Sequence, residues 1–451
     1  FNPSVTGDGS ATAQQLDFDF GTIVNTNGDN TQTETLVITY TARVVNTATN
    51  QNDAGPGTML NNTARFQWTG TSGTLSSAPD SAAPLEVVEP ELEVVKSVDA
   101  ANGDSGDTIT YTVVVQHSAD SDTDAFDITF SDTIPAEVNV SFPADFTIMH
   151  STLGDVSALF ELTGANELRT LAGVSFDLDF GETLTVTVVG TLDISVEPGA
   201  MLSNTACVDW TSLDGVNAAE RSGADGIGGT LNDYAVCSNS VNTTINSPTL
   251  GKELIATSIV DPNNANDEAV IGETIQYRVT VVLPEGTIDA AQIIDDLDLG
   301  LEFISFDSMQ VLSGGVSTTD VTSSIDLLTN MASFAPLVTG DGSTFAQQLT
   351  FDFGDLVNNN TDNAAAEAIV LTYTVRVMNV PGNTSNGGGL GTLLDNAAFF
   401  EFTRGATTVQ TSIDSAPPVQ VIEPELDITK TDSYDTPHLG QTVTYTLTIS
   451  H

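Results

Sequence analysis

Apolar and polar residues alternate along much of this chain with a period of two, which is the pattern of a β-strand with one buried face. The segment 108–117 reads TITYTVVVQH and the segment 183–190 reads TLTVTVVG, with aliphatic or aromatic residues at every second position. Gly, Asn and Asp separate such runs, as at residues 7–9, and these residue types favour tight turns. Few stretches show a helical period. The pattern predicts an all-β protein built from many short strands.

Long segments of the sequence occur twice. VTGDGSATAQQLDFDFGTIVN, which begins at Val5, returns as VTGDGSTFAQQLTFDFGDLVN from Val338. VEPELEVVK, which ends at Lys96, returns as IEPELDITK, which ends at Lys430, an offset of 334 residues (430 − 96). Lys96 and Lys252 also open similar units within that period. Two domain types therefore alternate, and we predict these boundaries: residues 1–91 as the C-terminal part of a B-type domain, 92–247 as an A-type domain, 248–424 as a B-type domain and 425–451 as the first strands of a further A-type domain.

Both domain types combine short strands with many threonine and β-branched residues, which is typical of immunoglobulin-like sandwiches. The linkers VEPELEV and NSPTLG are short, and each contains a proline but no flexible Gly/Ser tract. We therefore predict tandem immunoglobulin-like β-sandwich domains that form an extended rod. Because the chain begins at Phe1 without a signal peptide and ends within a strand-like run, we expect it to be part of a longer polypeptide. Its export signal and anchor would lie elsewhere in that polypeptide.

The chain is strongly acidic. Its 61 Asp and Glu residues against 10 Lys and Arg residues give a formal net charge of −51. A surface with this charge repels nucleic acids and anionic membranes and attracts divalent cations. No window approaches about 18 uninterrupted apolar residues, so we expect no transmembrane helix and no insertion of this segment into a membrane.

Enzymatic motifs are nearly absent. No metal-ligand spacing occurs among the histidines, which are His117, His150, His438 and His451. No nucleophile elbow, phosphate-binding loop or zinc-type cysteine pattern occurs. In so acidic a chain, a pair of aspartates has little meaning as a glycosidase signature. We therefore predict that the protein is not an enzyme and that it requires no cofactor.

Lysine is rare, and its positions carry the main chemical signal. The chain has three lysines, each on the apolar face of a predicted strand near the start of a repeat: Lys96, Lys252 and Lys430. A buried lysine costs free energy unless it is paired or neutral. Because the few lysines of this chain occupy positions where burial is costly, we expect their amines to take part in a chemical reaction. Our hypothesis is an internal isopeptide bond between each lysine and an asparagine side chain.

The asparagine candidates lie on strand faces that also carry aromatic residues, and they are Asn62, Asn204 and Asn396. An isopeptide bond also needs a protonated carboxyl that polarises the amide carbonyl and transfers protons. Asp132 and Asp295 lie on apolar faces and are the candidates for this acid. Asp296 is the alternative to Asp295, because a β-bulge would exchange the two positions.

Two other arrangements would give the same sequence pattern. One is a buried Lys–Asp pair that is hydrogen-bonded to the asparagine and does not react. The other is a set of lysines at strand ends whose side chains reach solvent. Neither terminal part can complete a bond alone, because the first holds Asn62 without a lysine and the last holds Lys430 without an asparagine.

The A-type domain also resembles a known repeat. LEVVKS, GDTITYTVVVQHS, FDITFSDTIP and LSNTACV resemble, in this order, the bacterial surface-protein repeat called domain of unknown function eleven. The resemblance implies an immunoglobulin-like fold in long, secreted, tandemly repeated proteins of the bacterial cell surface. It matches the K, SDTIP and NTA positions to Lys96, Asp132 and Asn204. The B-type domain departs from the pattern, since DDLDLG replaces the usual Asp-Thr-Leu-Pro.

Two further features concern crosslinks and metals. Cys207 and Cys237 are predicted to form a disulfide that closes a short excursion of the chain, and two free buried thiols are the alternative. Acidic loops after the first strand of each domain are candidates for Ca²⁺ binding, and their residues are Asp99, Asp104, Asp107, Asp261, Asp267 and Glu268. These residues lack the spacing of an EF-hand, and solvated acidic turns are the alternative.

Together these observations predict a structural segment of an extracellular fibre or stalk, in a giant repetitive bacterial surface protein whose domains carry internal Lys–Asn isopeptide bonds. Its partners would be neighbouring copies or repeats of the same protein. The alternative is an adhesin or ligand-binding surface module stiffened by Ca²⁺. In that case the Gly- and Asp-rich excursion 211–235 would present a surface to a carbohydrate or another cell.

Overall fold

The computed structural model describes residues 2–29, 31–52, 57–223, 234–261, 264–325, 334–385 and 391–451. Within these ranges the regular elements are β-strands, apart from one short 3₁₀ helix at Ser157–Leu159, which confirms the predicted all-β fold. The same ranges contain no helix that is both long and apolar enough to cross a membrane. The chain divides into two compact units, which are described separately: Phe1–Asp99 with Ile109–Gly190 and Ser203–Asn242, and Ala100–Thr108 with Thr191–Leu202 and Thr243–His451.

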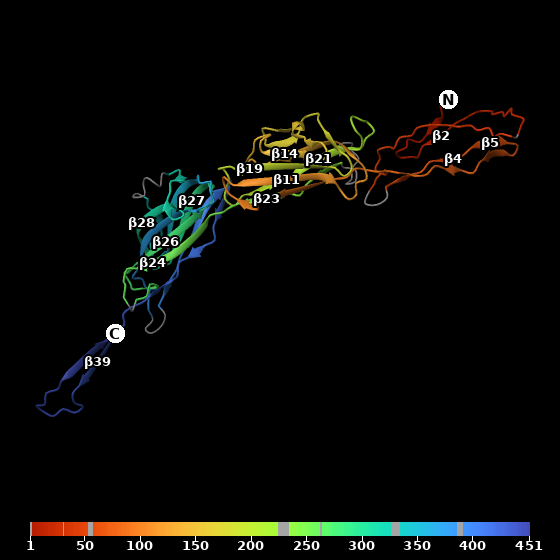
Figure 1. Cartoon of the computed structure of the whole chain (residues 1–451). Helices are drawn as coiled ribbons and strands as arrows, with labels where there is room; N and C mark the ends of the chain where they lie inside the picture. The colour runs from red at the N-terminus through yellow and green to blue at the C-terminus, as the bar shows by residue number, and fades with distance from the viewer. Residues whose placement is uncertain are drawn as a thin grey trace. The chain divides into compact units, whose positions relative to one another are not determined.

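The first unit contains a two-sheet sandwich (Figure 1). Its strands are β9 (Leu92–Val98), β11 (Thr108–His117), β12 (Ala125–Thr133), β13 (Val138–Asn139), β14 (Phe146–His150), β15 (Gly154–Asp155), β16 (Phe160–Leu162), β17 (Glu167–Thr170), β18 (Phe176–Leu178), β19 (Thr183–Leu192), β21 (Ala206–Thr211) and β22 (Ala235–Cys237). One sheet has the order β15-β14-β19-β11-β9, with β13 beside β19. The other has the order β16-β17-β12-β21-β22, with β18 beside β12. The strand that carries Lys96 is therefore an edge strand.

The alternation seen in the sequence gives this sandwich its core. Residues Ile109, Tyr111, Val113 and Val115 of β11 are fully buried, and the threonines between them face outward or are partly buried. Alternate residues of β19 are buried in the same way. Each aliphatic or aromatic side chain removed from water stabilises the fold by roughly 1.5–3 kcal/mol. The immunoglobulin-like sandwich predicted from this alternation is confirmed.

The second unit contains a sandwich with a similar arrangement (Figure 1). Its strands are β24 (Thr249–Thr257), β25 (Glu268–Ala269), β26 (Thr274–Leu283), β27 (Gly286–Leu297), β28 (Leu301–Ser313), β29 (Val316–Ser317), β30 (Val321–Ser323), β31 (Leu337–Thr339), β32 (Gln347–Asn358), β33 (Glu367–Val377), β34 (Leu393–Leu394), β35 (Asn396–Arg404), β36 (Thr407–Gln410), β37 (Asp414–Ser415) and β38 (Val419–Val421). One sheet has the order β24-β26-β33-β28-β29, and the other β30-β32-β27-β35-β36, with β31 beside β32 and β37 beside β35. The strand of Lys252, β24, is again an edge strand.

Smaller three-stranded sheets complete these sandwiches. The strands β10 (Asn102–Gly103), β23 (Val241–Ile245) and β20 (Met201–Asn204) form one in the order β10-β23-β20, and β25, β38 and β34 form another. In each of them two strands run parallel, β10 with β23 and β25 with β38.

The N-terminal and C-terminal parts of the chain form two-stranded pairs. These pairs are β1 (Ser4–Thr6) with β2 (Gln15–Asp17), β3 (Met59–Leu60) with β8 (Leu85–Glu86), β4 (Thr63–Ala64) with β7 (Asp80–Ser81), β5 (Gln67–Gly70) with β6 (Gly73–Ser76) and β39 (Asp427–Asp432) with β40 (Tyr445–Ser450). Most of their residues are exposed, because a single pair of strands has no second layer to cover its apolar face. Phe66 and Trp68, which the sequence places on an aromatic face, are 49% and 44% exposed.

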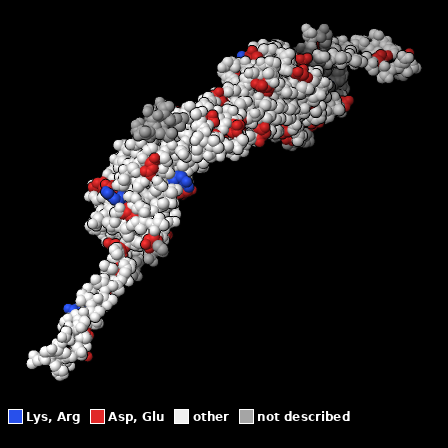
Figure 2. All heavy atoms as spheres, turned by 60° about the vertical axis from the view of Figure 1, so that its left-hand side comes forward, with Lys and Arg blue, Asp and Glu red and all other residues white. Residues whose placement is uncertain are grey.

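The surface reflects the composition. On the face of the molecule drawn in Figure 2, Asp and Glu side chains are scattered over both sandwiches, and Lys and Arg side chains are few. Charge of one sign keeps a protein soluble and opposes nonspecific association.

Candidate functional site

Lys96 lies in the core of the first unit. The alternation along β9 turns Leu92, Val94 and Lys96 to the same buried face, and the Lys96 side chain is 0% exposed. Its Nζ donates a hydrogen bond to Oδ2 of Asp132, 2.5 Å away. Asp132 comes from β12 in the opposite sheet and is also buried. The contact therefore joins the two layers of the sandwich.

The surroundings of this pair favour its neutral form. Burial lowers the pKa of the Lys96 amine, and the charge of Asp132 only partly opposes that shift. Burial likewise raises the pKa of Asp132, while Lys96 and Asn204 act in the opposite direction. Desolvation penalises the charged form of each group. An uncharged amine and a protonated carboxyl are the states that acyl transfer between side chains requires.

Asn204, at the end of β20, lies beside this pair. The residue is 1% exposed, and its carboxamide lowers the pKa of Asp132. Neither its Oδ1 nor its Nδ2 has a partner with full hydrogen-bond geometry among the described residues, and the same is true of Oδ1 of Asp132. Buried polar atoms without partners cost about 1–3 kcal/mol each. The amide of Asn204 therefore lies next to the carboxyl of Asp132, but no hydrogen bond of full geometry joins the two groups.

The second unit repeats the arrangement with Lys252, Asp295 and Asn396, which lie on β24, β27 and β35 and are all buried. Lys252 Nζ donates to Oδ2 of Asp295, and both side chains are 0% exposed. Asp296 faces outward and accepts a hydrogen bond from Gln348. Strand register thus brings Asp295, and not Asp296, into contact with the lysine.

A tyrosine that we did not predict as a site residue stands in the middle of this second cluster. Tyr373, on β33, donates its hydroxyl hydrogen to Oδ2 of Asp295 at 2.7 Å. Its hydroxyl oxygen lies 2.8 Å from both Lys252 Nζ and Asn396 Nδ2, which donate to it. One hydroxyl group therefore contacts the amine, the acid and the amide.

A signal for this tyrosine was present in the repeats. LVITYTARVVN from Leu36 returns as IVLTYTVRVMN from Ile369, and both contain the same tyrosine. In the N-terminal part, Asn62 Nδ2 donates to the hydroxyl of Tyr40 at 2.7 Å, as Asn396 does to Tyr373. The Tyr–Asn contact therefore occurs in both B-type segments of the chain.

Burial has the same electrostatic effect in the second cluster. It lowers the pKa of Lys252 and raises the pKa of Asp295, and the attraction between the two opposes both shifts. Burial, followed by the charge of Asp295, raises the pKa of Tyr373 well above its ordinary value. Tyr373 therefore stays protonated and can donate a hydrogen bond.

Each lysine also lies over an aromatic ring of the neighbouring strand. The distance from Nζ to the ring centroid is 5.3 Å for Lys96 over Tyr111 and 5.4 Å for Lys252 over Tyr277. In the C-terminal hairpin it is 4.6 Å for Lys430 over Tyr445, although Lys430 is exposed there. The contact between lysine and tyrosine thus recurs at all three lysines, although only Lys96 and Lys252 are buried.

The predicted pairing of Cys207 with Cys237 is present as a disulfide with an S–S distance of 2.02 Å. The two residues lie opposite each other on β21 and β22. Residues 224–233 of the excursion 211–235 lie outside the described part of the chain. In the described part, Arg221 is 5% exposed and forms an ion pair with Glu89. The hydroxyl of Tyr234 donates to the same carboxylate at 3.0 Å.

The acidic residues predicted to bind Ca²⁺ behave differently from one another. Asp104 and Asp107 lie close together, since Asp107 Oδ2 accepts a hydrogen bond from Asp104 N at 3.1 Å. Asp99 accepts a hydrogen bond from Thr110 N of β11, and Glu268 accepts one from Ala265 N of its own turn. Asp267 is exposed, and Asp261 lies in an isolated bridge to Asn264.

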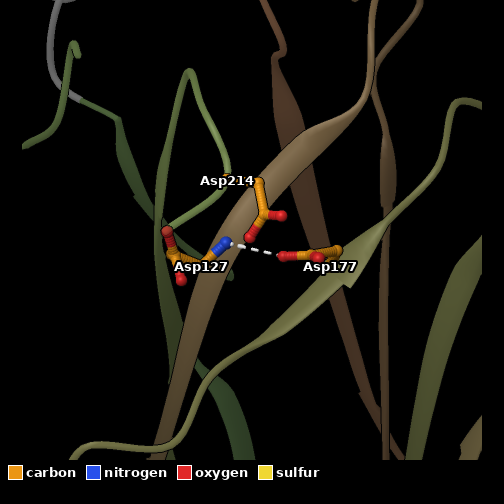
Figure 3. Close-up of side chains that lie close together, drawn as sticks. All are labelled: Asp127, Asp177 and Asp214. Carbon is orange, nitrogen blue, oxygen red and sulfur yellow. Dashed lines mark hydrogen bonds between the residues drawn. The ribbon is translucent and has the colours of Figure 1, made fainter. Parts of the chain in front are cut away.

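The first unit also contains a group of three aspartates that was not predicted from the sequence (Figure 3). Oxygen atoms of Asp127, Asp177 and Asp214 lie within 4.8 Å of one another. Asp127 has a φ of 49° at a β-bulge of β12, and its backbone N donates to Oδ1 of Asp177. Burial, and then repulsion from Asp214 and Asp127, raises the pKa of Asp177. A bulge and a loop create this group, and neither is visible as periodicity.

No protein-family model matches the chain, and no curated protein matches it. The resemblance to the surface-protein repeat therefore stays a prediction. Among solved structures, the chain is similar to the C-terminal domain of the AgI/II polypeptide BspA of Streptococcus agalactiae, with 13% identity over 72% of this chain and 99% of that one and a TM-score of 0.28. It is similar to BcpA, the major pilin subunit of Bacillus cereus, with 14% identity over 75% and 71% and a TM-score of 0.25. It is also similar to a C-terminal fragment of the major pilin GBS80 of Streptococcus agalactiae, with 9% identity over 72% and 91% and a TM-score of 0.26. At these values nothing about function follows from the similarity.

Proposed function

We propose that this chain is a structural segment of an extracellular fibre or stalk on a bacterial surface, and that an internal Lys–Asn isopeptide bond locks each of its two sandwiches. One observation carries the proposal. In both units a buried carboxyl group contacts a buried lysine amine, beside a buried asparagine amide. Desolvation of a buried Lys–Asp pair costs free energy that the attraction between the two groups often does not recover.

The reaction needs no other reagent. The neutral Nζ of lysine attacks Cγ of asparagine, a C–N bond forms, and the C–N bond to the amide nitrogen breaks. The protonated aspartate donates its proton to the amide oxygen and then takes one from the attacking amine. It passes that proton to the departing nitrogen and recovers its own from the oxygen when the tetrahedral intermediate collapses. One molecule of ammonia leaves, and atoms and charge balance. The low polarity of the core lowers the pKa of each lysine and raises the pKa of each aspartate, which is toward both required protonation states.

In the second unit we assign a proton-transfer role to Tyr373. Its hydroxyl donates to the acid and accepts from the nitrogen that would leave as ammonia. It therefore connects the proton source with the departing group. In the first unit no hydroxyl is hydrogen-bonded to Asp132 or to the amide of Asn204 among the described residues, so Asp132 would act on the amide directly.

The position of the bond suits a protein under tension. In the second unit β24 is the first strand of the sandwich, and it lies against β35 and β37, which come late in the chain. A covalent bond from Lys252 to Asn396 would join these two ends of the fold. Force applied along the chain could then not peel β24 from the sheet edge.

An adhesin role is the alternative, and its candidate surface is the excursion 211–235. Arg221 in that excursion is buried and engaged with Glu89, Asn46 and Thr47. This part of the excursion therefore packs against the preceding segment of the first unit, and its side chain is not presented to a ligand. The observation favours the structural role.

The test is an intact mass of the full 451-residue chain under reducing conditions, so that the disulfide does not contribute. We expect the mass to be lower than the sequence mass by two molecules of ammonia. Lys96→Ala and Lys252→Ala should each restore one, and peptide mapping should find Lys96 joined to Asn204 and Lys252 joined to Asn396. Lys430→Ala is the matched control and should leave the deficit unchanged. A folded protein with the full sequence mass would refute the crosslink.

A further inference from the structure

A second buried acidic cluster lies within the second unit, away from Lys252. A cavity of about 230 Å³ is lined there by Asp104, Asn246, Glu285 and Glu367, together with neighbouring polar and apolar residues. Asp104 is 6% exposed, Glu285 5% and Glu367 1%. Three residues with carboxylate side chains, each of them largely buried, therefore line one cavity.

A tight turn places the first of these carboxylates. Asp107 N donates to Asp104 O, and Ser105 N donates to Glu285 O, which fixes the turn 104–107 against the start of β27. Gly106 has a φ of 89°, and a Cβ there would lie 2.6 Å from Cβ of Thr361. Only glycine permits this approach. The turn is thus built to bring Asp104 close to Glu285.

Two oxygen atoms in the cavity have no partner. Oδ1 of Asp104 and Oε2 of Glu285 are buried and make no hydrogen bond to any described residue. Protein donors engage the other oxygen of Asp104 and both oxygens of Glu367: Asn246 Nδ2 donates to Oδ2 of Asp104, and Asn358 and Asn360 donate to Glu367. One carboxylate oxygen of Asp104 and one of Glu285 therefore have no donor among the described residues.

No lysine, arginine or histidine of the described residues forms an ion pair with this acidic cluster. None of the ion pairs formed among the described residues includes Asp104, Asp107, Glu285 or Glu367. Burial and repulsion from Asp104, Asp107 and Glu367 raise the pKa of Glu285 to about 7. Buried carboxylates in folded proteins are normally paired with a cation or coordinate a metal.

We propose that this cavity is a Ca²⁺ site in which Asp104 Oδ1 and Glu285 Oε2 are protein ligands and water fills the remaining positions. Ca²⁺ accepts irregular sets of about six to eight oxygen ligands and tolerates their flexibility, whereas Mg²⁺ requires a regular octahedron. The proposal does not depend on the isopeptide bonds, because the two clusters share no residue. The trio Asp127, Asp177 and Asp214 supports no such proposal, because its carboxylates are only partly buried or exposed.

The experiment is calorimetric titration of the full chain with CaCl₂ after removal of metals by a chelator. We expect binding with a dissociation constant between about 10⁻⁵ and 10⁻³ M, the range of moderate and weak protein sites. Glu285→Gln and Asp104→Asn should each weaken it by at least about tenfold, since each removes a charged ligand. Asp296→Asn, which removes an exposed carboxylate of the same unit, is the matched control and should bind as the wild type does.

Thermal unfolding separates loss of a ligand from damage to the fold. In chelator, Glu285→Gln should melt at the same temperature as the wild type or higher, because it relieves carboxylate repulsion. In CaCl₂ only the wild type and Asp296→Asn should gain stability. The proposal is wrong if the wild type binds no Ca²⁺ at millimolar concentration, or if Glu285→Gln binds it equally well. It is also wrong if Asp214→Asn alone abolishes binding, which would place the ion at the aspartate trio.

Discussion

The Lys–Asp–Asn clusters of the two units differ in one side chain. In the second unit the hydroxyl of Tyr373 lies among the amine, the acid and the amide. Hydrogen bonds of Leu192 with residues 106 and 107 begin the pairing of β11 with β19. Val377 makes the same hydrogen bonds with residues 272 and 273 where β26 pairs with β33. Four residues further along both strands, Val188 lies opposite Tyr111. Val188 thus occupies the position that Tyr373 has in the second unit, where Tyr373 lies opposite Tyr277.

This difference changes what holds each amide in place. Asn396 Nδ2 has a hydrogen-bond acceptor, whereas both polar atoms of Asn204 lack a partner among the described residues. An unpaired buried amide destabilises the unreacted fold by about 1–3 kcal/mol. If the proposed bond forms, the first unit would therefore gain more from it, because the reaction would consume the unpaired amide. The second unit holds its amide in a hydrogen-bonded position before any reaction.

The largest expected effect is that of removing the acid. Asp132→Ala leaves the Lys96 amine buried without a partner, which should destabilise the first unit by about 3–5 kcal/mol. Asp295→Ala should cost less, because Tyr373 still accepts a hydrogen bond from Lys252. Both changes should stop the loss of ammonia in their own unit only. Calorimetry of the two unfolding transitions and intact mass provide the measurements.

Asp296→Ala is the control for that comparison. Its side chain is exposed and bonds only to Gln348, so both unfolding and mass should stay close to wild type. Equal effects of Asp132→Ala and Asp295→Ala would show that the tyrosine does not distinguish the two clusters.

The disulfide provides the next largest difference, because only the first unit has one. Cys207 and Cys237 are separated by 30 residues, and a loop of that length corresponds to about 3–4 kcal/mol in the chain-entropy model. Reduction should therefore lower the melting temperature of the first unit and leave the second unchanged. Cys207→Ser with Cys237→Ser should reproduce the shift without reductant. A shift of both units would indicate that the units do not unfold independently.

Much of the fold and part of the site follow from alternation alone. Period-two patterns place Lys96, Asp132 and Asn204 on buried faces, because a strand turns every second side chain to the same side. They cannot show which faces meet across the sandwich, so the contact between Lys96 and Asp132 required the structure. The choice between Asp295 and Asp296 also depended on two register shifts in β27 that no local pattern reveals.

Other features of these sites could not be predicted from strand periodicity, for a different reason. Alternation identifies Tyr373 as a buried residue but says nothing about the partners of its hydroxyl group, which come from three other strands. The contact of Asp104 with Glu285 depends on a glycine turn and on residues about 180 positions apart. The trio around Asp127 depends on a bulge. Long-range packing and backbone irregularity, and not periodicity, decide these sites.

Tyr373→Phe tests the comparison directly. Without the hydroxyl, Lys252 loses one of its hydrogen-bond partners and Asn396 Nδ2 loses its acceptor, while the ring still fills the core. We expect a loss of about 1–3 kcal/mol in the second unit. Ammonia loss from that unit should also become slower during refolding, and time-resolved intact mass would measure it. An unchanged rate would remove Tyr373 from the proton path and leave it a structural role only.

The smallest expected effect, and the sharpest contrast, is that of Tyr111→Phe. Tyr111 is as buried as Tyr373, and burial, followed by the charge of Asp132, raises its pKa to about 12. Its hydroxyl, however, has no hydrogen-bond partner among the described residues. Phenylalanine keeps the ring below the Lys96 amine and removes only the unpaired polar atom, so the unfolding free energy should stay within about 0.5 kcal/mol or rise. A loss as large as that of Tyr373→Phe would mean that the Tyr111 hydroxyl is hydrogen-bonded in solution, and that the two clusters are more alike than their geometry indicates.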